Sequence, residues 1–170
     1  MATAGASGED RRATPDDAFD EGAYDASIDA LWLSFRTQLA DLLAELSASS
    51  PIKVYCLWSE MFAPQPRLVF TLTRAQRLRV TATFADLFPY PPEQGQRVDL
   101  LVQRGWRPLR NETCILEFGR REVDAAALQA EQVFRWVWDV LDPSFLVSEE
   151  HDVGRRFTDP PPMSREPKMR

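Results

Sequence analysis

The sequence predicts an α+β fold, with a single antiparallel sheet of about five strands and three helices in the order α-β-β-β-α-β-β-α. Two observations support this prediction. The expected helices each carry one apolar stripe, and the expected strands alternate apolar with polar side chains, as in a sheet covered on one face only. Strands grouped apart from helices in this way are typical of α+β domains.

The first helix is expected from about Ser27, and the run SASSP, which ends at Pro51, should terminate it. Residues 1–25 hold seven acidic and two basic side chains without helical periodicity, so we expect a disordered acidic tail there. The apolar residues that recur at helical spacing after this tail are Ile28, Leu31, Trp32, Phe35, Leu39, Leu42, Leu43 and Leu46.

Three strands are expected next, in IKVYCLW (52–58), RLVFTLT (67–73) and RLRVTATF (77–84). Each alternates apolar with polar or outward-facing side chains, which is the period of a half-buried strand. The loop WSEMFAPQP follows the first of them. The short link TRAQ between the second and third fits a hairpin, although it lacks an Asn-Gly turn.

A Gly-Trp pair in LLVQRGWRP (100–108) should end a short second helix that begins after the prolines at 91 and 92. If Gly105 lies just past this helix in the left-handed conformation, Trp106 falls where a Schellman motif places its contact with Leu101. We therefore interpret Trp106 as part of a packed helix end and not as a displayed ring. Two more strands are expected in RPLR and TCILEFG.

The last helix is expected from about Glu122 to Leu141, where Asp142-Pro143 stops it. From Ser148 the chain is charged and rich in proline, so the domain is predicted to span residues 26–147 and a disordered tail residues 148–170. The residues of the expected apolar stripe are Val123, Ala126, Ala127, Ala130, Phe134, Val137 and Leu141.

Composition excludes several function classes. Residues 26–147 hold fourteen acidic and thirteen basic side chains, whereas nucleic-acid binding needs a dominant positive field. No apolar run approaches the roughly 20 residues that cross a bilayer, and the first residues do not resemble a secretory signal, so we expect a cytoplasmic protein without a membrane partner. Cys56 and Cys114 lack metal or redox spacing and are expected to be buried thiols.

No catalytic or metal-binding constellation is apparent. The single histidine, His151, lies in the expected tail, which excludes a Ser-His-Asp or Cys-His mechanism in the folded core. Only Gly95, Gly105 and Gly119 fall inside the domain, so no glycine-rich phosphate loop is present. We therefore expect a protein that is not an enzyme and that uses no cofactor and no metal, although carboxylate-only hydrolases exist.

The order of elements, together with RVDLLVQRGWRP (97–108) and FRWVWDVLDPSFL (134–146), resembles the YbjN and type III secretion chaperone-like (Tir chaperone-like) domains that are widespread in actinobacteria. The resemblance covers about residues 27–147. One departure is the strand after the Gly-Trp pair, which carries Cys114 and Phe118 where the family often has tryptophan.

This resemblance implies a small cytoplasmic protein that binds other proteins, often as a homodimer, without a cofactor. In the secretion chaperones a partner polypeptide wraps around apolar patches on the sheet and the flanking helices. Exposed aromatic and apolar side chains are favoured at such interfaces. The candidate partner-binding residues are Tyr55, Leu57, Phe62, Val69, Leu128 and Trp136.

Two hypotheses remain open. The leading one is a non-enzymatic protein-interaction or chaperone-like module, with Leu128 and Trp136 pointing away from the apolar stripe of the last helix. The alternative is a small-molecule-binding or regulatory domain with a pocket between helices and sheet, lined by residues such as Trp32, Trp58 and Phe84. A concave apolar cavity with converging polar groups would favour a ligand, whereas an exposed apolar patch would favour a protein partner.

Overall fold

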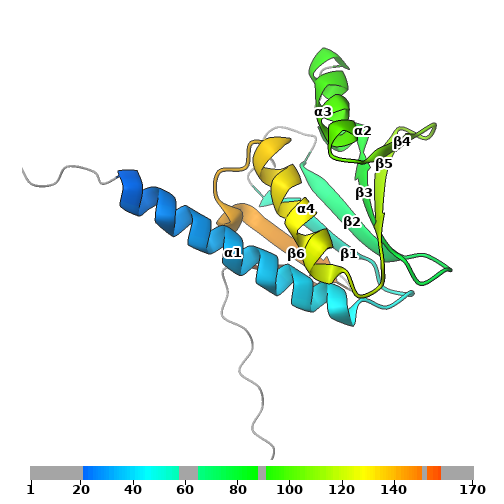
Figure 1. Ribbon diagram of the computed structural model, residues 1–170, viewed down its shortest axis with the longest axis horizontal. Helices are drawn as coiled ribbons and strands as arrows, with labels where there is room; N and C mark the ends of the chain where they lie inside the picture. The colour runs from blue at the N-terminus through cyan, green and yellow to red at the C-terminus, as the bar shows by residue number, and fades with distance from the viewer. Residues whose placement is uncertain (1–20, 58–64, 88–90, 151–152, 158–170) are drawn as a thin grey trace, which may run out of the picture.

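The computed structural model describes residues 21–57, 65–87, 91–150 and 153–157, which form one antiparallel sheet with two long helices on one of its faces (Figure 1). The strands lie in the order β4-β5-β3-β2-β1-β6-β7. The predicted class, an α+β fold with a single antiparallel sheet, is confirmed. The elements in chain order are α1 (Glu21–Glu45), β1 (Ile52–Cys56), β2 (Arg67–Leu72), β3 (Leu78–Thr83), α2 (Phe84–Leu87), α3 (Pro91–Gln103), β4 (Arg107–Leu109), β5 (Thr113–Phe118), α4 (Val123–Trp136), a 3-10 helix (Pro143–Phe145), β6 (Leu146–Glu150) and β7 (Val153–Arg156).

The alternation predicted for the central strands sets the two faces of the sheet. Val54 pairs with Leu68 and Phe70 pairs with Val80, so apolar side chains from adjacent strands line up on the face beneath α1 and α4. The opposite face receives the intervening residues, most of which are polar. One covered face and one solvated face are what period-2 alternation requires.

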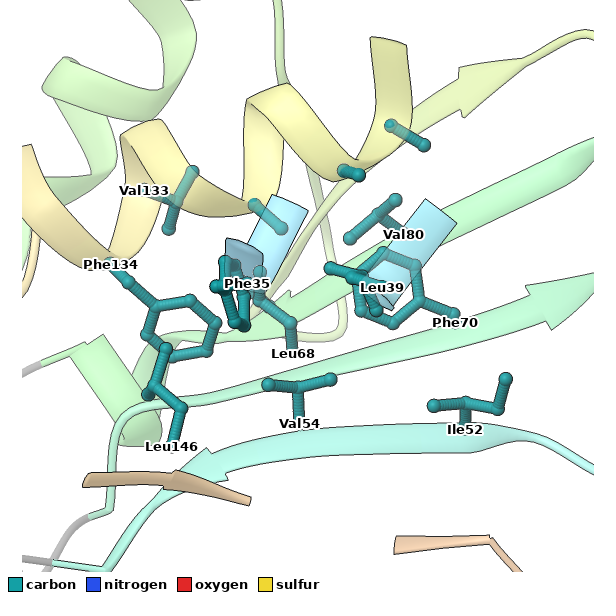
Figure 2. Packing of buried hydrophobic residues seen from close by; sticks show 14 of the residues in the cluster. Phe35, Leu39, Ile52, Val54, Leu68, Phe70, Val80, Val133, Phe134 and Leu146 are labelled. Carbon is teal, nitrogen blue, oxygen red and sulfur yellow. The ribbon is translucent and has the colours of Figure 1, made fainter. Parts of the chain in front are cut away.

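The main core lies between the sheet and the two long helices, α1 and α4. Phe35 and Leu39 of α1 and Phe134 of α4 are fully buried over the inward side chains of the strands, as Figure 2 shows. The ring of Phe35 meets that of Phe134 edge-on with the centroids 6.2 Å apart. These side chains belong to the apolar stripes that the sequence predicted, and their burial holds the helices on the sheet.

The Schellman ending predicted for the second helix is present at the end of α3. Gly105 has a φ of +87°, the Trp106 amide donates to the Leu101 carbonyl at 3.1 Å, and the Gly105 amide donates to the Val102 carbonyl at 2.9 Å. Both Trp106 and Leu101 are buried. Trp106 is therefore a structural residue of the helix end, as its spacing indicated.

The sheet is larger than predicted because the chain beyond α4 returns to it. β6 pairs with β1 and β7 pairs with β6, so the described sheet has seven strands and reaches Arg156, whereas the sequence placed a tail from residue 148. Glu149 pairs with Lys53 across the two strands at 3.1 Å. Strands that contain several charged residues lack the apolar alternation from which strands are predicted, although charged residues are common in strands near a sheet edge.

Both long helices have boundaries that differ from the prediction. α1 begins at Glu21, and its first two turns extend past the sheet with exposed side chains, so no apolar stripe marks them (Figure 1). α4 ends at Trp136 and not at Leu141. Asp139 takes a left-handed φ of +55°, which turns the chain away and leaves Leu141 79% exposed.

Candidate functional site

An open groove of about 440 Å³ runs along the outer surface of α1 and α4, away from the sheet. The two helices are antiparallel, since Asp29 near the start of α1 meets Arg135 at the end of α4 at 2.9 Å. The short side chains of Ala40 and Ala125 leave space between the helices. The groove is lined by Leu33, Arg36, Thr37, Ala40 and Asp41 of α1 and by Asp124, Ala125 and Leu128 of α4.

The helical layer also displays large apolar side chains to solvent. Leu33 is 53% exposed and Leu128 is 37% exposed, one on each wall of the groove. Two turns beyond Leu128, Trp136 is 58% exposed. The large apolar residues of this exposed kind in the described chain all belong to helices or to the segment after α4: Tyr24, Leu33, Val102, Leu128, Trp136, Leu141 and Phe145.

The exposed ring of Trp136 is oriented by Arg135. The Arg135 guanidinium lies 5.5 Å from the ring centroid of Trp136 and 5.5 Å from that of Trp32, so it stands between a buried ring and an exposed one. It also contacts Asp29 at 2.9 Å and Glu131 at 3.1 Å. A ring held in this way is presented to solvent with little loss of conformational entropy on binding.

Charge is distributed unevenly along the groove. Arg36 faces Glu131 across the helix pair at 3.7 Å, and Glu131 in turn accepts from Arg135. Asp41 and Asp124 line the groove near the C-terminal end of α1 and the N-terminal end of α4. Neither forms an ion pair with any residue that the structure describes. The groove therefore combines apolar walls with two carboxylates that have no cationic partner in the described chain.

The opposite face of the sheet has a different character. Tyr55 of β1 and Val69 of β2, two of the predicted contact residues, lie there and are half-buried. Arg79 donates to Glu117 across β3 and β5 at 2.8 and 2.6 Å, and this hydrogen bond lowers the pKa of the Glu117 carboxyl below its ordinary value. Arg77 also contacts Glu117 at 3.5 Å, so this carboxylate is paired with two arginines, one in the neighbouring strand β3 and one just before it.

The structure separates the predicted contact residues into two groups. Leu128 lines the groove and Trp136 projects from the same helix, whereas Tyr55 and Val69 are on the far side of the sheet. Leu57 is half-buried just after β1. Phe62, like Trp58, lies outside the described residues.

The sequence analysis did not name Leu33 as a candidate contact residue, although its position in the helix indicates an exposed leucine. It falls off the apolar stripe of α1, so a leucine at that position faces solvent on an otherwise polar side of the helix. What the sequence does not show is that Leu128, from a helix far along the chain, lines the other wall of the same groove.

Groups that would support chemistry are scarce in the described residues. No cluster of three or more His, Cys, Asp or Glu side chains is placed there to hold a metal ion. Burial raises the pKa of the Cys114 thiol to about 11, which keeps it protonated and unreactive near neutral pH. Trp32, named as a lining residue of a small-molecule pocket, is 1% exposed and its indole donates to the Leu141 carbonyl at 3.3 Å, so it is part of the core.

Comparison with known proteins identifies a family. A family model described as "T3SS (YopN, CesT) and YbjN peptide-binding chaperone 3" matches residues 25–152, which is most of the chain. Searches of curated proteins and of solved structures gave no match. In the described part of the chain, no helix is long and apolar enough to span a membrane.

Proposed function

Since the chain belongs to the T3SS and YbjN family of peptide-binding chaperones, we propose that it is a non-enzymatic module that holds a segment of a partner polypeptide in the groove between α1 and α4. The groove, with Leu33 and Leu128 on its walls, is the observation that carries this assignment. An apolar side chain of the partner placed between these leucines would remove all three from water. Full burial of an exposed leucine side chain contributes about 1.5–3 kcal/mol, and the partly exposed wall leucines contribute less each.

The shape of the groove supports a peptide as the ligand. It is open to solvent along the helix pair and not enclosed, so a peptide segment can lie in it without a conformational change that opens a cavity. An amphipathic segment that lays its apolar face into a groove between helices is a recurrent mode of peptide recognition. The opposite face of the sheet offers less apolar surface to a ligand, because no large apolar side chain of the described strands is exposed.

The test is an array of overlapping peptides probed with the full-length protein, followed by fluorescence anisotropy on the peptides that bind. We expect a subset of peptides with apolar residues at helical spacing to bind. The double substitution Leu33→Ser, Leu128→Ser should weaken their binding at least about tenfold, since both walls lose apolar area. Val102→Ser is the matched control: Val102 is also exposed but lies on α3, away from the groove, and its loss should leave binding unchanged.

Two results would contradict the proposal. Absence of binding to every peptide in the array would argue against a peptide-binding role. Binding that survives the double leucine substitution but is lost in Tyr55→Ser, Val69→Ser would place the peptide on the opposite face of the sheet. Thermal unfolding of each variant, measured in the same buffer, shows whether a loss of binding reflects a loss of fold.

A further inference from the structure

The two carboxylates of the groove distinguish it from an ordinary apolar surface. Asp41 lies two helical turns beyond Leu33 on α1, and Asp124 lies one turn before Leu128 on α4. Because the helices are antiparallel, these displacements run in the same direction, and both carboxylates line the same stretch of the groove. The apolar walls and the acidic end are therefore separated by about one to two helical turns, or about 5–11 Å.

The basic side chains of the helix pair do not neutralise this acidic end. Arg36, which lines the groove, faces Glu131, and Arg135 is held by Asp29 and Glu131. Arg120 donates from the loop before α4 to the carbonyls of Leu43, Ala44 and Leu46. Asp41 and Asp124 remain without an ion pair among the described residues, so a bound segment would meet their charge directly.

We propose that the groove selects a cationic amphipathic segment of the partner polypeptide, with an apolar side chain between Leu33 and Leu128 and a lysine or arginine one to two helical turns away, beside Asp41 and Asp124. This inference rests on the proposed peptide-binding function and adds the class of peptide. A docked segment excludes water from the groove and strengthens the attraction between a cation and the carboxylates. An acidic segment would instead place like charges together, which costs affinity.

The chain itself contains a basic segment that is an alternative candidate for the groove. Phe157 ends the described part of the chain beside α1, where its ring lies 4.6 Å from that of Phe35 and its carbonyl accepts from Gln38. Residues 158–170 follow, and their last six residues, REPKMR, hold three basic side chains and one acidic one. The partner segment is our assignment, and the test includes a comparison that would reveal this internal competitor.

The experiment uses three fluorescent peptides of about four helical turns that share one apolar pattern and differ only in their polar positions, which are lysine, glutamine or glutamate. Anisotropy titrations with the full-length protein should rank them lysine, glutamine, glutamate, with about tenfold or more between the first and the last, since two exposed charge contacts change sign. The preference should shrink as NaCl is raised from about 0.05 M to about 0.5 M, because salt screens charges at the surface.

The variant Asp41→Asn, Asp124→Asn tests where the preference arises. It should weaken binding of the lysine peptide by about threefold to tenfold and make the affinities of the three peptides nearly equal. Asp99→Asn is the matched control, because Asp99 is an exposed carboxylate of α3 that does not line the groove, and it should change nothing. Urea unfolding of each variant confirms that the fold is retained.

The outcomes separate this inference from the proposed function. Equal binding of the three peptides, or a lysine preference that persists in Asp41→Asn, Asp124→Asn, would overturn the inference while peptide binding stands. If none of the three peptides binds and no peptide of the array binds, both this inference and the proposed peptide-binding function are wrong. If a chain that ends at residue 157 binds every peptide much more tightly than the full chain, the protein's own C-terminal segment is the occupant and the partner assignment is wrong.

Discussion

This domain has two solvent-facing surfaces, the outer side of the α1–α4 pair and the opposite face of the sheet. They differ in how their charged side chains are paired and in how far their apolar side chains are exposed. On the sheet, Lys53 meets Glu149 and Arg79 meets Glu117, so these two carboxylates pair with cations across neighbouring strands. On the helices, Leu33 and Leu128 stand exposed above a groove.

The difference also holds for apolar residues. Ile115 of β5 and Val147 of β6 lie on the opposite face of the sheet, yet they are only 4% and 5% exposed. Trp136 on the helical side is 58% exposed. The sheet surface therefore completes its contacts within the chain, whereas the helical surface leaves apolar and acidic groups that a second polypeptide can complete.

The sharpest way to examine this contrast is to substitute two neighbouring residues of α1 that point in opposite directions. Phe35→Ala should lower the free energy of unfolding by about 3–5 kcal/mol, because it opens a cavity in the fully buried core. Leu33→Ala should lower it by less than about 0.5 kcal/mol. Urea unfolding followed by circular dichroism measures both values. A large loss for Leu33→Ala would mean that this side chain belongs to the core and not to a binding surface.

The end of α1 that carries Asp41 depends on a contact from another element, and its removal is the next largest effect. α1 has no basic residue in its last turn, and Arg120 supplies a guanidinium that donates to three carbonyls there at 3.0–3.2 Å. Arg120→Met should lower the free energy of unfolding by about 1.5–3 kcal/mol. Arg121→Met is the control, since its exposed side chain makes no such contact. Equal losses in the two variants would show that Arg120 has no specific role.

Much of the buried framework could be predicted from the sequence because its signals are local. The apolar spacing of α1 predicted the burial of Trp32, Phe35 and Leu39, and the Gly105-Trp106 pair predicted the Schellman ending. Both features depend on residues within a few turns of one another. A helix stripe or a helix stop can therefore be recognised without knowing what packs on it.

The groove and the last two strands could not be predicted because they depend on distant pairings. Leu33 and Leu128 are far apart in sequence, and only the antiparallel packing of α1 on α4 brings them to one groove. Likewise, β6 becomes a strand through its pairing with β1, and its charged residues give no clear period. Such tertiary context overrides local propensity.

A smaller effect is expected on the sheet face, where pH tests the charge pairing. The hydrogen bond from Arg79 lowers the folded pKa of Glu117, so the stability that it contributes is present above the unfolded carboxyl pKa of about 4.3 and is lost as pH falls through the lower folded value. Arg79→Gln should lower the free energy of unfolding near neutral pH by less than about 1 kcal/mol, because both side chains are partly exposed.

Urea unfolding of the wild type and of Arg79→Gln, repeated along a pH series, measures this dependence. The difference in the free energy of unfolding between the two proteins should become smaller as Glu117 is protonated in both the folded and the unfolded state. Peptide affinity should be the same for both proteins. A difference that stays constant to low pH would show that Arg79 stabilises the sheet through packing and not through the carboxylate.

Substitution of Trp136 should cost little stability and still cause a clear loss of binding. This combination distinguishes a residue of a binding surface from a residue of the core. The ring of Trp136 lies against the guanidinium of Arg135, which keeps its contacts with Asp29 and Glu131 when the ring is removed. Trp136→Ala should therefore lower the free energy of unfolding by about 0.5 kcal/mol, while an exposed tryptophan at an interface commonly contributes tenfold or more to affinity. Trp138→Ala is the matched control, because that ring is buried and its indole donates to the Asp86 carbonyl at 2.8 Å, so it should destabilise strongly. If Trp136→Ala destabilises as much as Trp138→Ala and leaves peptide affinity intact, the binding surface ends at the groove and the ring of Trp136 serves only the fold.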